Sequence, residues 1–122
     1  MVEFVDIYPT LAELGGLQAS ATLEGASLAP ATDEPDRPWK RAAFSQVEWE
    51  DRIYGRTVRT DRFRYTAWEG DGGGEELYDH ESDPGEFRNL AGEPDFARAA
   101  RAHRKLLANG WRSARRRLRL IK

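Results

Sequence analysis

The sequence predicts an α+β fold in which a small antiparallel sheet of about four strands packs against a C-terminal helix, with a short helix ahead of the sheet. Residues 54–60 and 62–68 are rich in β-branched and aromatic side chains in strand-like alternation. The last quarter of the chain repeats apolar residues at helical spacing, and so does a shorter stretch before residue 15. The 122 residues fit one domain of ordinary size.

The first element is a short helix within residues 1–17. Ile7, Leu11 and Leu14 recur at i, i+4 and i+7 and form one apolar stripe, which ends at two glycines. Asp6 stands where the N-cap of this helix is expected. So short a helix cannot bury its stripe by itself, and we expect part of the stripe to be exposed.

Residues 18–40 are predicted to form a loop or linker, because one glycine and three prolines interrupt a polar, acidic stretch. A first strand is expected from Arg41 to Gln46, followed by a mobile loop at 48–52. The last strand, at 76–79, is reached through a glycine-rich loop at 70–74.

The two long strands in between, 54–60 and 62–68, are joined by a polar turn. Side chains alternate between the two faces of a strand, so Tyr54, Arg56 and Val58 share one face. Thr57 and Arg59 share the other. The pattern indicates that one face of the sheet is covered and that the other is partly wet.

Asp83-Pro84-Gly85-Glu86 has the form of a capping box and predicts a short helical turn, with Asp83 as the cap. The last helix begins after Pro94 and is expected to cover the sheet and to end near Gly110. Its apolar face comprises Phe96, Ala99, Ala100, His103, Leu106 and Leu107.

Composition excludes several classes. There is no cysteine for disulfides or thiolate metal sites, and no apolar run long enough to span a membrane. The acidic start does not resemble a signal peptide, so the chain as it stands is expected to be soluble and cytoplasmic, although the compartment of a longer parent stays open. Residues 98–122 carry ten of the 19 basic residues and no acidic one. No aromatic residues alternate with the tail arginines, so neither nucleic acid nor a membrane is expected as a partner.

Three motifs stand close together in one order and spacing: Glu76-Leu77-Tyr78-Asp79, Asp83-Pro84-Gly85-Glu86 and Asn89-Leu90-Ala91. They resemble the carboxy-terminal signature of the sulfatases. Residues 5–17 are similar to that family's V-D-x-x-P-T-L helix, residues 25–28 to its G-x-S-L turn, and residues 55–68 to the hairpin of its iduronate-2-sulfatase-like branch. The resemblance runs from about Val2 to Arg112, and it implies the C-terminal subdomain of an alkaline-phosphatase-like sulfatase.

The resemblance also implies which parts are missing. The family's nucleophile is a formylglycine, made from the Cys or Ser of a C/S-x-P-x-R motif, beside a divalent metal such as calcium. The chain has no cysteine, and its one S-x-P match, at Ser82, places Glu86 where the motif needs arginine. We therefore expect no catalytic residue, metal site or cofactor in this chain, and no activity from it alone. The expected partners are a missing N-terminal sulfatase domain and, in the intact enzyme, a sulfated sugar.

The resemblance divides the chain into four segments. Residues 1–17 are the helix left from the end of the large domain, and 18–40 are a linker. Residues 41–112 are the C-terminal subdomain, and 113–122 are a basic tail.

The hairpin offers the one candidate binding site, made of Trp49, Tyr54, Arg56 and Arg59. Guanidinium groups and aromatic rings suit sulfate or carboxylate groups of a substrate. The alternative is that these arginines pair with acidic side chains across the sheet. Of the two histidines, His103 is interpreted as a packed, hydrogen-bonded core residue. His80, next to acidic residues, matches no metal-ligand spacing.

Two other interpretations stay open. The chain could be a non-catalytic module that binds polyanions through its arginine-rich hairpin or tail. It could also be a remnant that folds weakly without its parent, which predicts exposed apolar surface on the first helix.

Overall fold

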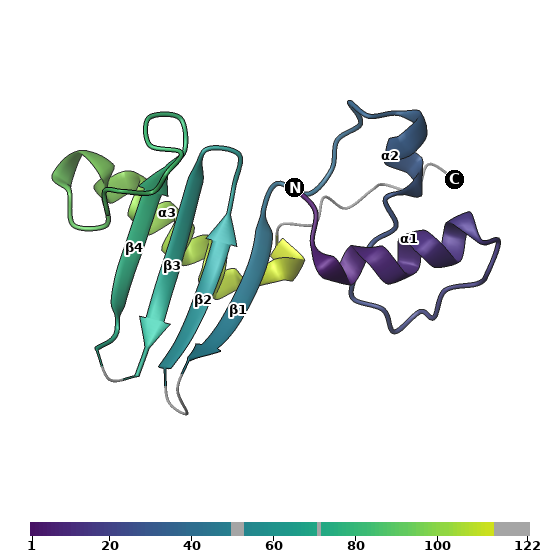
Figure 1. The fold of residues 1–122 in the computed structure, drawn as a ribbon, viewed down its shortest axis with the longest axis horizontal. Helices are drawn as coiled ribbons and strands as arrows, with labels where there is room; N and C mark the ends of the chain where they lie inside the picture. The colour runs from purple at the N-terminus through teal and green to yellow at the C-terminus, as the bar shows by residue number, and fades with distance from the viewer. Residues whose placement is uncertain (50–52, 71, 114–122) are drawn as a thin grey trace. The chain divides into compact units, whose positions relative to one another are not determined.

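The computed structural model describes residues 1–49, 53–70 and 72–113, with only the backbone of Trp49 (Figure 1). The chain divides into two compact units. We call Val2–Trp39 the N-terminal unit and the part from Lys40 onward the sheet unit. The loop expected at 48–52 and the tail expected at 113–122 lie largely outside the described residues.

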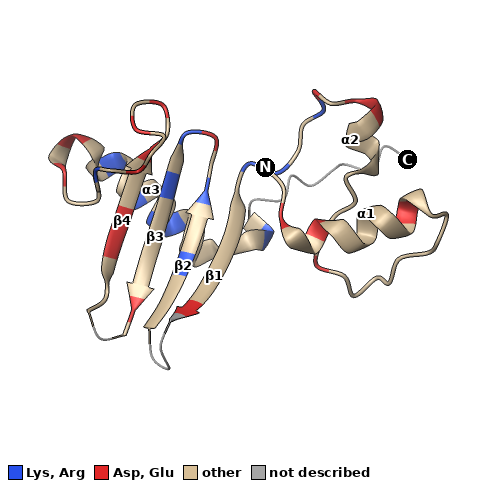
Figure 2. Cartoon of the chain, in the orientation of Figure 1, with Lys and Arg blue, Asp and Glu red and all other residues tan. Residues whose placement is uncertain are grey.

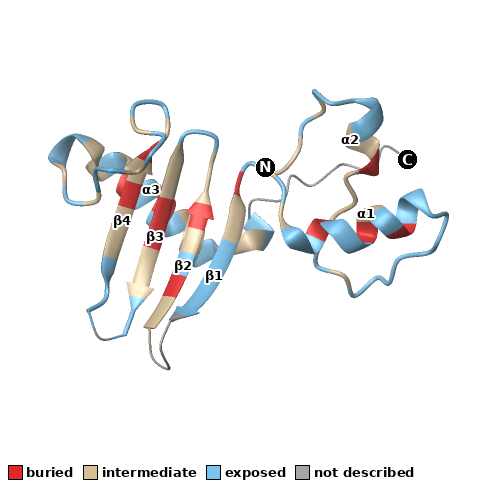
Figure 3. Ribbon diagram, in the orientation of Figure 1, coloured by how far each residue is buried: buried red, intermediate tan, exposed pale blue. Residues whose placement is uncertain are grey.

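The sheet unit contains a four-stranded antiparallel sheet of order β1-β2-β3-β4, as predicted. The strands are β1 (Ala43–Trp49), β2 (Ile53–Arg59), β3 (Phe63–Glu69) and β4 (Gly74–Asp79). The register sets Val58 opposite Tyr65, and Tyr65 opposite Leu77. These three side chains are fully buried and form the centre of the core (Figure 3).

Helix α3 (Ala97–Asn109) packs on the face of the sheet that carries Val58, as the apolar stripe of that helix predicts. A 3-10 turn, η3 (Pro94–Phe96), leads into α3, and η4 (Trp111–Ser113) follows it. We call the face under α3 the helix-side face, and the other the opposite face. Figure 1 shows α3 running behind the four strands.

The motif Asn89-Leu90 protects the outer edge of β4. The Asn89 Oδ1 atom accepts the N–H of Leu77 at 3.0 Å, and its amide nitrogen donates to the Glu75 carbonyl at 3.0 Å. The N–H of Leu90 then donates to the Leu77 carbonyl at 2.8 Å. The side chain of Asn89 thus replaces a neighbouring strand, since edge groups without partners would be costly.

The N-terminal unit contains η1 (Phe4–Asp6), α1 (Ile7–Leu14) and α2 (Ala29–Asp33). The prediction that 18–40 is only a loop or linker is therefore wrong at α2, where Pro30 stands in the first helical turn and is tolerated there. None of the described helices is long and apolar enough to cross a membrane.

Asp6 occupies the N-cap position of α1 that the sequence suggested, but its side chain makes no capping hydrogen bond to α1. Its carboxylate is fully buried and accepts the N–H of Glu3 at 3.0 Å and of Ala26 at 2.8 Å. The Thr10 hydroxyl accepts the N–H of Leu28 at 2.8 Å. A Cβ at Gly25 would lie 1.7 Å from a backbone oxygen, so the turn can approach η1 this closely only with glycine there. The V-D-x-x-P-T helix and the G-x-S-L turn are thus joined by hydrogen bonds.

The helical turn predicted at 83–86 is also absent. The segment forms a β-turn, with the Glu86 N–H donating to the Asp83 carbonyl at 3.1 Å. Glu86 has φ 57°, in the left-handed region, which stops a helix. Its side chain contacts His80 and Arg64 instead of the backbone of the turn.

Candidate functional site

The sheet separates the four residues of the predicted binding site. Tyr54 and Arg56 lie on the helix-side face of β2, whereas Arg59 lies on the opposite face. The Trp49 side chain lies outside the described part of the structure. The four residues therefore do not converge on one ligand, although alternation along β2 already indicated the separation of Arg56 from Arg59.

Most arginines of the hairpin are paired with carboxylates. Arg56 contacts Glu69, Arg62 binds Asp79, and Arg64 contacts Glu86. Figure 2 shows the basic residues on β2 and β3 and the acidic residues on β4 and at strand ends. This internal neutralisation argues against a polyanion-binding module that would use the hairpin as a basic patch.

Arg59 differs from these arginines. Its Nη1 atom is buried and has no hydrogen-bond partner among the described residues. It lies directly across from Arg64 in the pairing of β2 with β3, so both residues share the opposite face, although the Arg64 guanidinium contacts Tyr78 and Glu86. A buried donor without a partner is costly, and an anionic group placed here would relieve that cost.

Arg64 belongs to a cluster that sequence reasoning missed. Its guanidinium lies 5.4 Å from the centre of the Tyr78 ring, and it shares the Glu86 carboxylate with His80. The Arg64 Nε atom is buried and has no hydrogen-bond partner in the part of the chain that the structure describes. The sequence did contain a signal for this: alternation along the strand places Arg64 on the same face of the sheet as Arg59.

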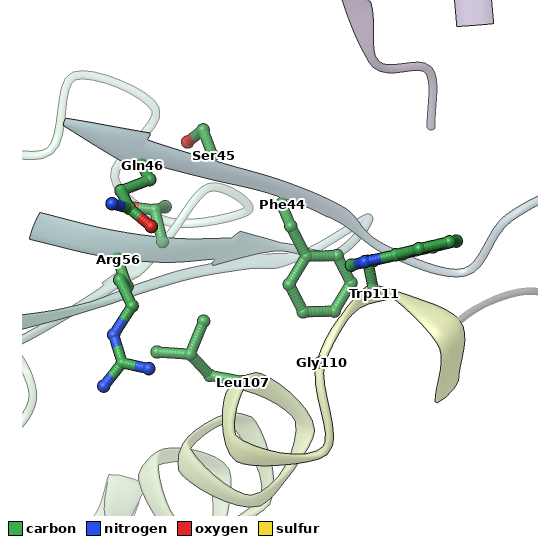
Figure 4. Close-up of a pocket in the computed structure, with 8 residues that line it drawn as sticks. Phe44, Ser45, Gln46, Arg56, Leu107, Gly110 and Trp111 are labelled. Atoms are coloured by element: carbon green, nitrogen blue, oxygen red, sulfur yellow. The ribbon is translucent and has the colours of Figure 1, made fainter. Parts of the chain in front are cut away.

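On the helix-side face, β1, β2 and the end of α3 enclose a shallow pocket of about 300 Å³ (Figure 4). The Arg56 guanidinium points into it, and the Trp111 ring lies beside Phe44. Tyr54 is not among its lining residues, which are Phe44, Ser45, Gln46, Arg56, Thr57, Leu107, Gly110 and Trp111. Tyr54 pairs with Glu48 across the strands, and the hydrogen bond and charge of Glu48 raise the pKa of Tyr54.

The histidines behave as structural residues. His103 Nε2 lies 3.1 Å from the Thr60 hydroxyl, and its Nδ1 lies 2.8 Å from the Ala99 carbonyl, so the prediction of a hydrogen-bonded core histidine is confirmed. Within residues 1–49, 53–70 and 72–113, no group of three or more His, Asp or Glu side chains is arranged to hold a metal ion. The metal that the resemblance implies does not fit these residues.

The comparisons with known proteins agree with this arrangement. The model of one family, N-sulphoglucosamine sulphohydrolase, C-terminal, matches residues 1–111. The chain belongs to this family of sulfatase C-terminal domains.

Individual relatives are much longer than this chain. A Δ4,5-hexuronate-2-O-sulfatase of Bacteroides thetaiotaomicron is 39% identical over 108 residues, which are 84% of this chain and 22% of that protein. The crystal structure of a putative sulfatase from the same organism matches with a TM-score of 0.73 and 39% identity, covering 85% of this chain and 23% of the other. The chain therefore spans about a fifth of the length of the curated relatives it matches.

The same fold occurs in a hydrolase of another ester. The phosphonate monoester hydrolase of Agrobacterium radiobacter matches with a TM-score of 0.71 and 28% identity over 85% of this chain and 23% of the other. These matches confirm the predicted fold class, that of the C-terminal part of a sulfatase of the alkaline-phosphatase-like fold. The fold alone does not select the substrate.

Proposed function

We propose that this chain is the C-terminal part of a sulfuric ester hydrolase that acts on sulfated sugars, and that a large N-terminal domain carries out the ester cleavage. The observation that carries the proposal is the match of residues 1–111 to a sulfatase C-terminal family, by a chain that spans about a fifth of its relatives. The hexuronate sulfatase at 39% identity supports a sulfated sugar as substrate.

The chain by itself is proposed to be inactive. It has no cysteine to become formylglycine. The hydroxyl of Ser82 donates to the Asp79 carboxylate at 3.1 Å, so it serves the turn. Glu86, at the position of the motif's arginine, already binds Arg64. The formylglycine and the divalent metal are therefore assigned to the missing domain, and no catalytic step is assigned to these residues.

The first helix supports the idea of a missing domain. Leu11 and Leu14 of its predicted stripe are 64% and 63% exposed, and Phe4 is 91% exposed. Exposed large apolar side chains gathered on one short segment are typical of a contact with another protein surface. We assign the contact to the large domain.

Arg59 is proposed to bind an anionic group of the substrate, with Arg64 beside it. The proposal rests on its buried Nη1 atom, since a guanidinium can hold a sulfate or carboxylate by two hydrogen bonds. Trp49 stays a candidate for shaping the substrate pocket, whereas Tyr54 and Arg56, on the other face of the sheet, cannot reach an anion held by Arg59.

The test of the catalytic assignment begins with the DNA upstream of Met1. We expect an open reading frame that encodes C/S-x-P-x-R and clustered aspartates. The 122-residue chain and the longer product would each be incubated with a 2-O-sulfated unsaturated hexuronate disaccharide, and sulfate release would be measured. Release by the longer product alone supports the proposal, whereas release by the short chain contradicts it.

The Arg59 assignment needs kinetics in that longer product. Arg59→Gln should raise KM at least about tenfold, because a charge-assisted hydrogen bond is worth roughly 1.5–3 kcal/mol. Arg88→Gln is the matched control, since Arg88 is 70% exposed and pairs only with Glu93 among the described residues. An unchanged KM for Arg59→Gln would remove Arg59 from the substrate site.

A further inference from the structure

We propose that the pocket between β1, β2 and the end of α3 binds an acidic sugar unit, as a carbohydrate site on the helix-side face of the sheet. The inference goes beyond the proposed hydrolysis, because it concerns the helix-side face of the sheet and needs no turnover. It rests on the side chains that the pocket brings together (Figure 4).

One wall of the pocket is apolar. Phe44 comes from β1, which is distant in the sequence from Leu107 of α3 and Trp111 of η4. Aromatic and aliphatic surface of this kind packs against the C–H groups of a pyranose ring. The wall therefore suits a flat ring with an apolar face.

Gly110 positions this wall. It ends α3 with φ 73°, a backbone conformation that residues other than glycine rarely adopt. The chain reverses there, and η4 brings Trp111 beside Phe44 (Figure 4). The aromatic platform thus depends on the backbone of the helix end.

The other wall is polar. Gln46 and Arg56 are direct cross-strand partners in the pairing of β1 with β2, so the register holds an amide next to a guanidinium. Arg56 contacts Glu69 through one nitrogen, Nη2. A guanidinium carries five N–H donors in a planar fork, so donors remain for a carboxylate or sulfate, while the Gln46 amide can bind hydroxyl groups.

The charge of the surroundings selects a small acidic unit over a long polyanion. Arg56 is the one cation lining the pocket in the part of the chain that is described, and its charge is partly balanced by Glu69. Residues 1–97 hold all 21 acidic residues and only nine basic ones, which would repel a strand of dense negative charge. One acid group on one ring, stacked on the aromatic wall, fits both the volume of about 300 Å³ and this charge.

The pocket differs from the Arg59 cluster in a way that an experiment can resolve. Ser45 and Thr57 line the pocket, yet their side chains alternate to the opposite face, and the Thr57 hydroxyl lies 2.9 Å from that of Thr66 there. The sheet therefore separates the two ligands. Ligands bound at the two sites would therefore shift the amide signals of different residues.

The full chain, labelled with ¹⁵N, would be titrated with a 2-O-sulfated unsaturated hexuronate disaccharide, and its amide spectrum recorded. We expect saturable shifts centred on 44–46, 56–57 and 107–111, with a Kd on the order of 1 mM. A neutral disaccharide of the same size should bind at least about tenfold more weakly, because it lacks the acid group for Arg56. Inorganic sulfate alone should also bind weakly, because it lacks the ring.

Variants then assign the contacts. Trp111→Ala and Arg56→Gln should each weaken binding at least about tenfold, and Gln46→Ala, on the exposed edge of β1, gives a milder change that leaves the core intact. Arg88→Gln is the control and should bind as the unchanged chain does. Each variant's amide spectrum shows whether it is folded.

Three outcomes would overturn the proposal. They are shifts centred on Arg59 and Arg64, equal binding of inorganic sulfate, and unchanged affinity in both Trp111→Ala and Arg56→Gln with native spectra. None of them bears on ester cleavage, which is read by sulfate release from the longer product. The carbohydrate site and the hydrolase assignment can therefore fail separately.

Discussion

Replacing Asp79 by asparagine should remove one contribution to the loss of stability of the sheet unit between about pH 4 and pH 2. The Asp79 side chain is 2% exposed. It accepts Arg62 Nε at 2.8 Å and Nη2 at 2.7 Å, and it also accepts the Glu81 N–H and the Ser82 hydroxyl, each at 3.1 Å. These donors hold β4 against the β2–β3 turn.

The size of the effect follows from the pKa. The hydrogen bonds from Arg62, followed by those from the Glu81 N–H and Ser82, lower the pKa of Asp79 from 3.8 to about 2, against the opposing effect of burial. At about 1.4 kcal/mol for each pKa unit, this corresponds to roughly 2 kcal/mol. The figure is an upper value, because Arg62 is 47% exposed and water competes for it.

The sign is fixed by the direction of the shift. A carboxylate whose pKa is lower in the folded state stabilises that state fully above its unfolded pKa, near 4, and loses the stabilisation as pH falls to the folded value, near 2. The free energy of unfolding of the unchanged chain should therefore fall by up to about 2 kcal/mol across this window because of Asp79 alone.

Urea unfolding, followed by far-ultraviolet circular dichroism at pH 5, 4, 3 and 2, measures this contribution. Asp79→Asn should be less stable than the unchanged chain by about 2 kcal/mol at pH 5, and the difference should shrink toward pH 2. Glu93→Gln, which breaks the exposed pair with Arg88, should leave the slope unchanged. A difference for Asp79→Asn that is constant with pH would refute the reasoning.

Two further substitutions test the motifs shared with the sulfatases. Gly25→Ala should abolish the hydrogen-exchange protection of the amides at 26 and 28, because its Cβ would lie 1.7 Å from a backbone oxygen, whereas Gly92→Ala, with open space around its Cβ, should not. Protection that survives in Gly25→Ala would contradict the account. Asn89→Ala should lower the free energy of unfolding by about 1–3 kcal/mol, because it leaves the Leu77 N–H without its acceptor, and a loss below about 0.5 kcal/mol would mean that water replaces the amide.

Local sequence patterns correctly predicted those elements whose structure depends on residues close together in the chain. Alternation in 54–60 and 62–68 predicted β2 and β3 within one residue of their bounds. The stripe that includes His103 predicted α3 and its packing, and the glycine at 110 predicted its end. In each of these elements the periodic spacing of side chains matches the backbone geometry, which is a short-range property.

The capping motifs did not predict the hydrogen bonds and ion pairs that their side chains make with distant partners. Asp6 occupies the N-cap position of α1, but its carboxylate does not cap that helix and binds the amides of Glu3 and of Ala26, the latter twenty residues away. Glu86 has the context of a capping box, but its carboxylate binds His80 and Arg64 from the sheet. Capping rules consider only nearby backbone donors, so they could not anticipate either contact.

The sequence by itself determined the strands, the closing helix, the absence of a cysteine-derived nucleophile, and the placement of Arg56 and Arg59 on opposite sides of one strand. Only the tertiary structure decided which side lies under α3. That packing put Arg56 into a pocket with Trp111. On the opposite face, the Nη1 atom of Arg59 is buried without a partner among the described residues. The physical reason is that alternation fixes relative orientation along a strand, whereas the face that is covered depends on helix packing over long sequence separation.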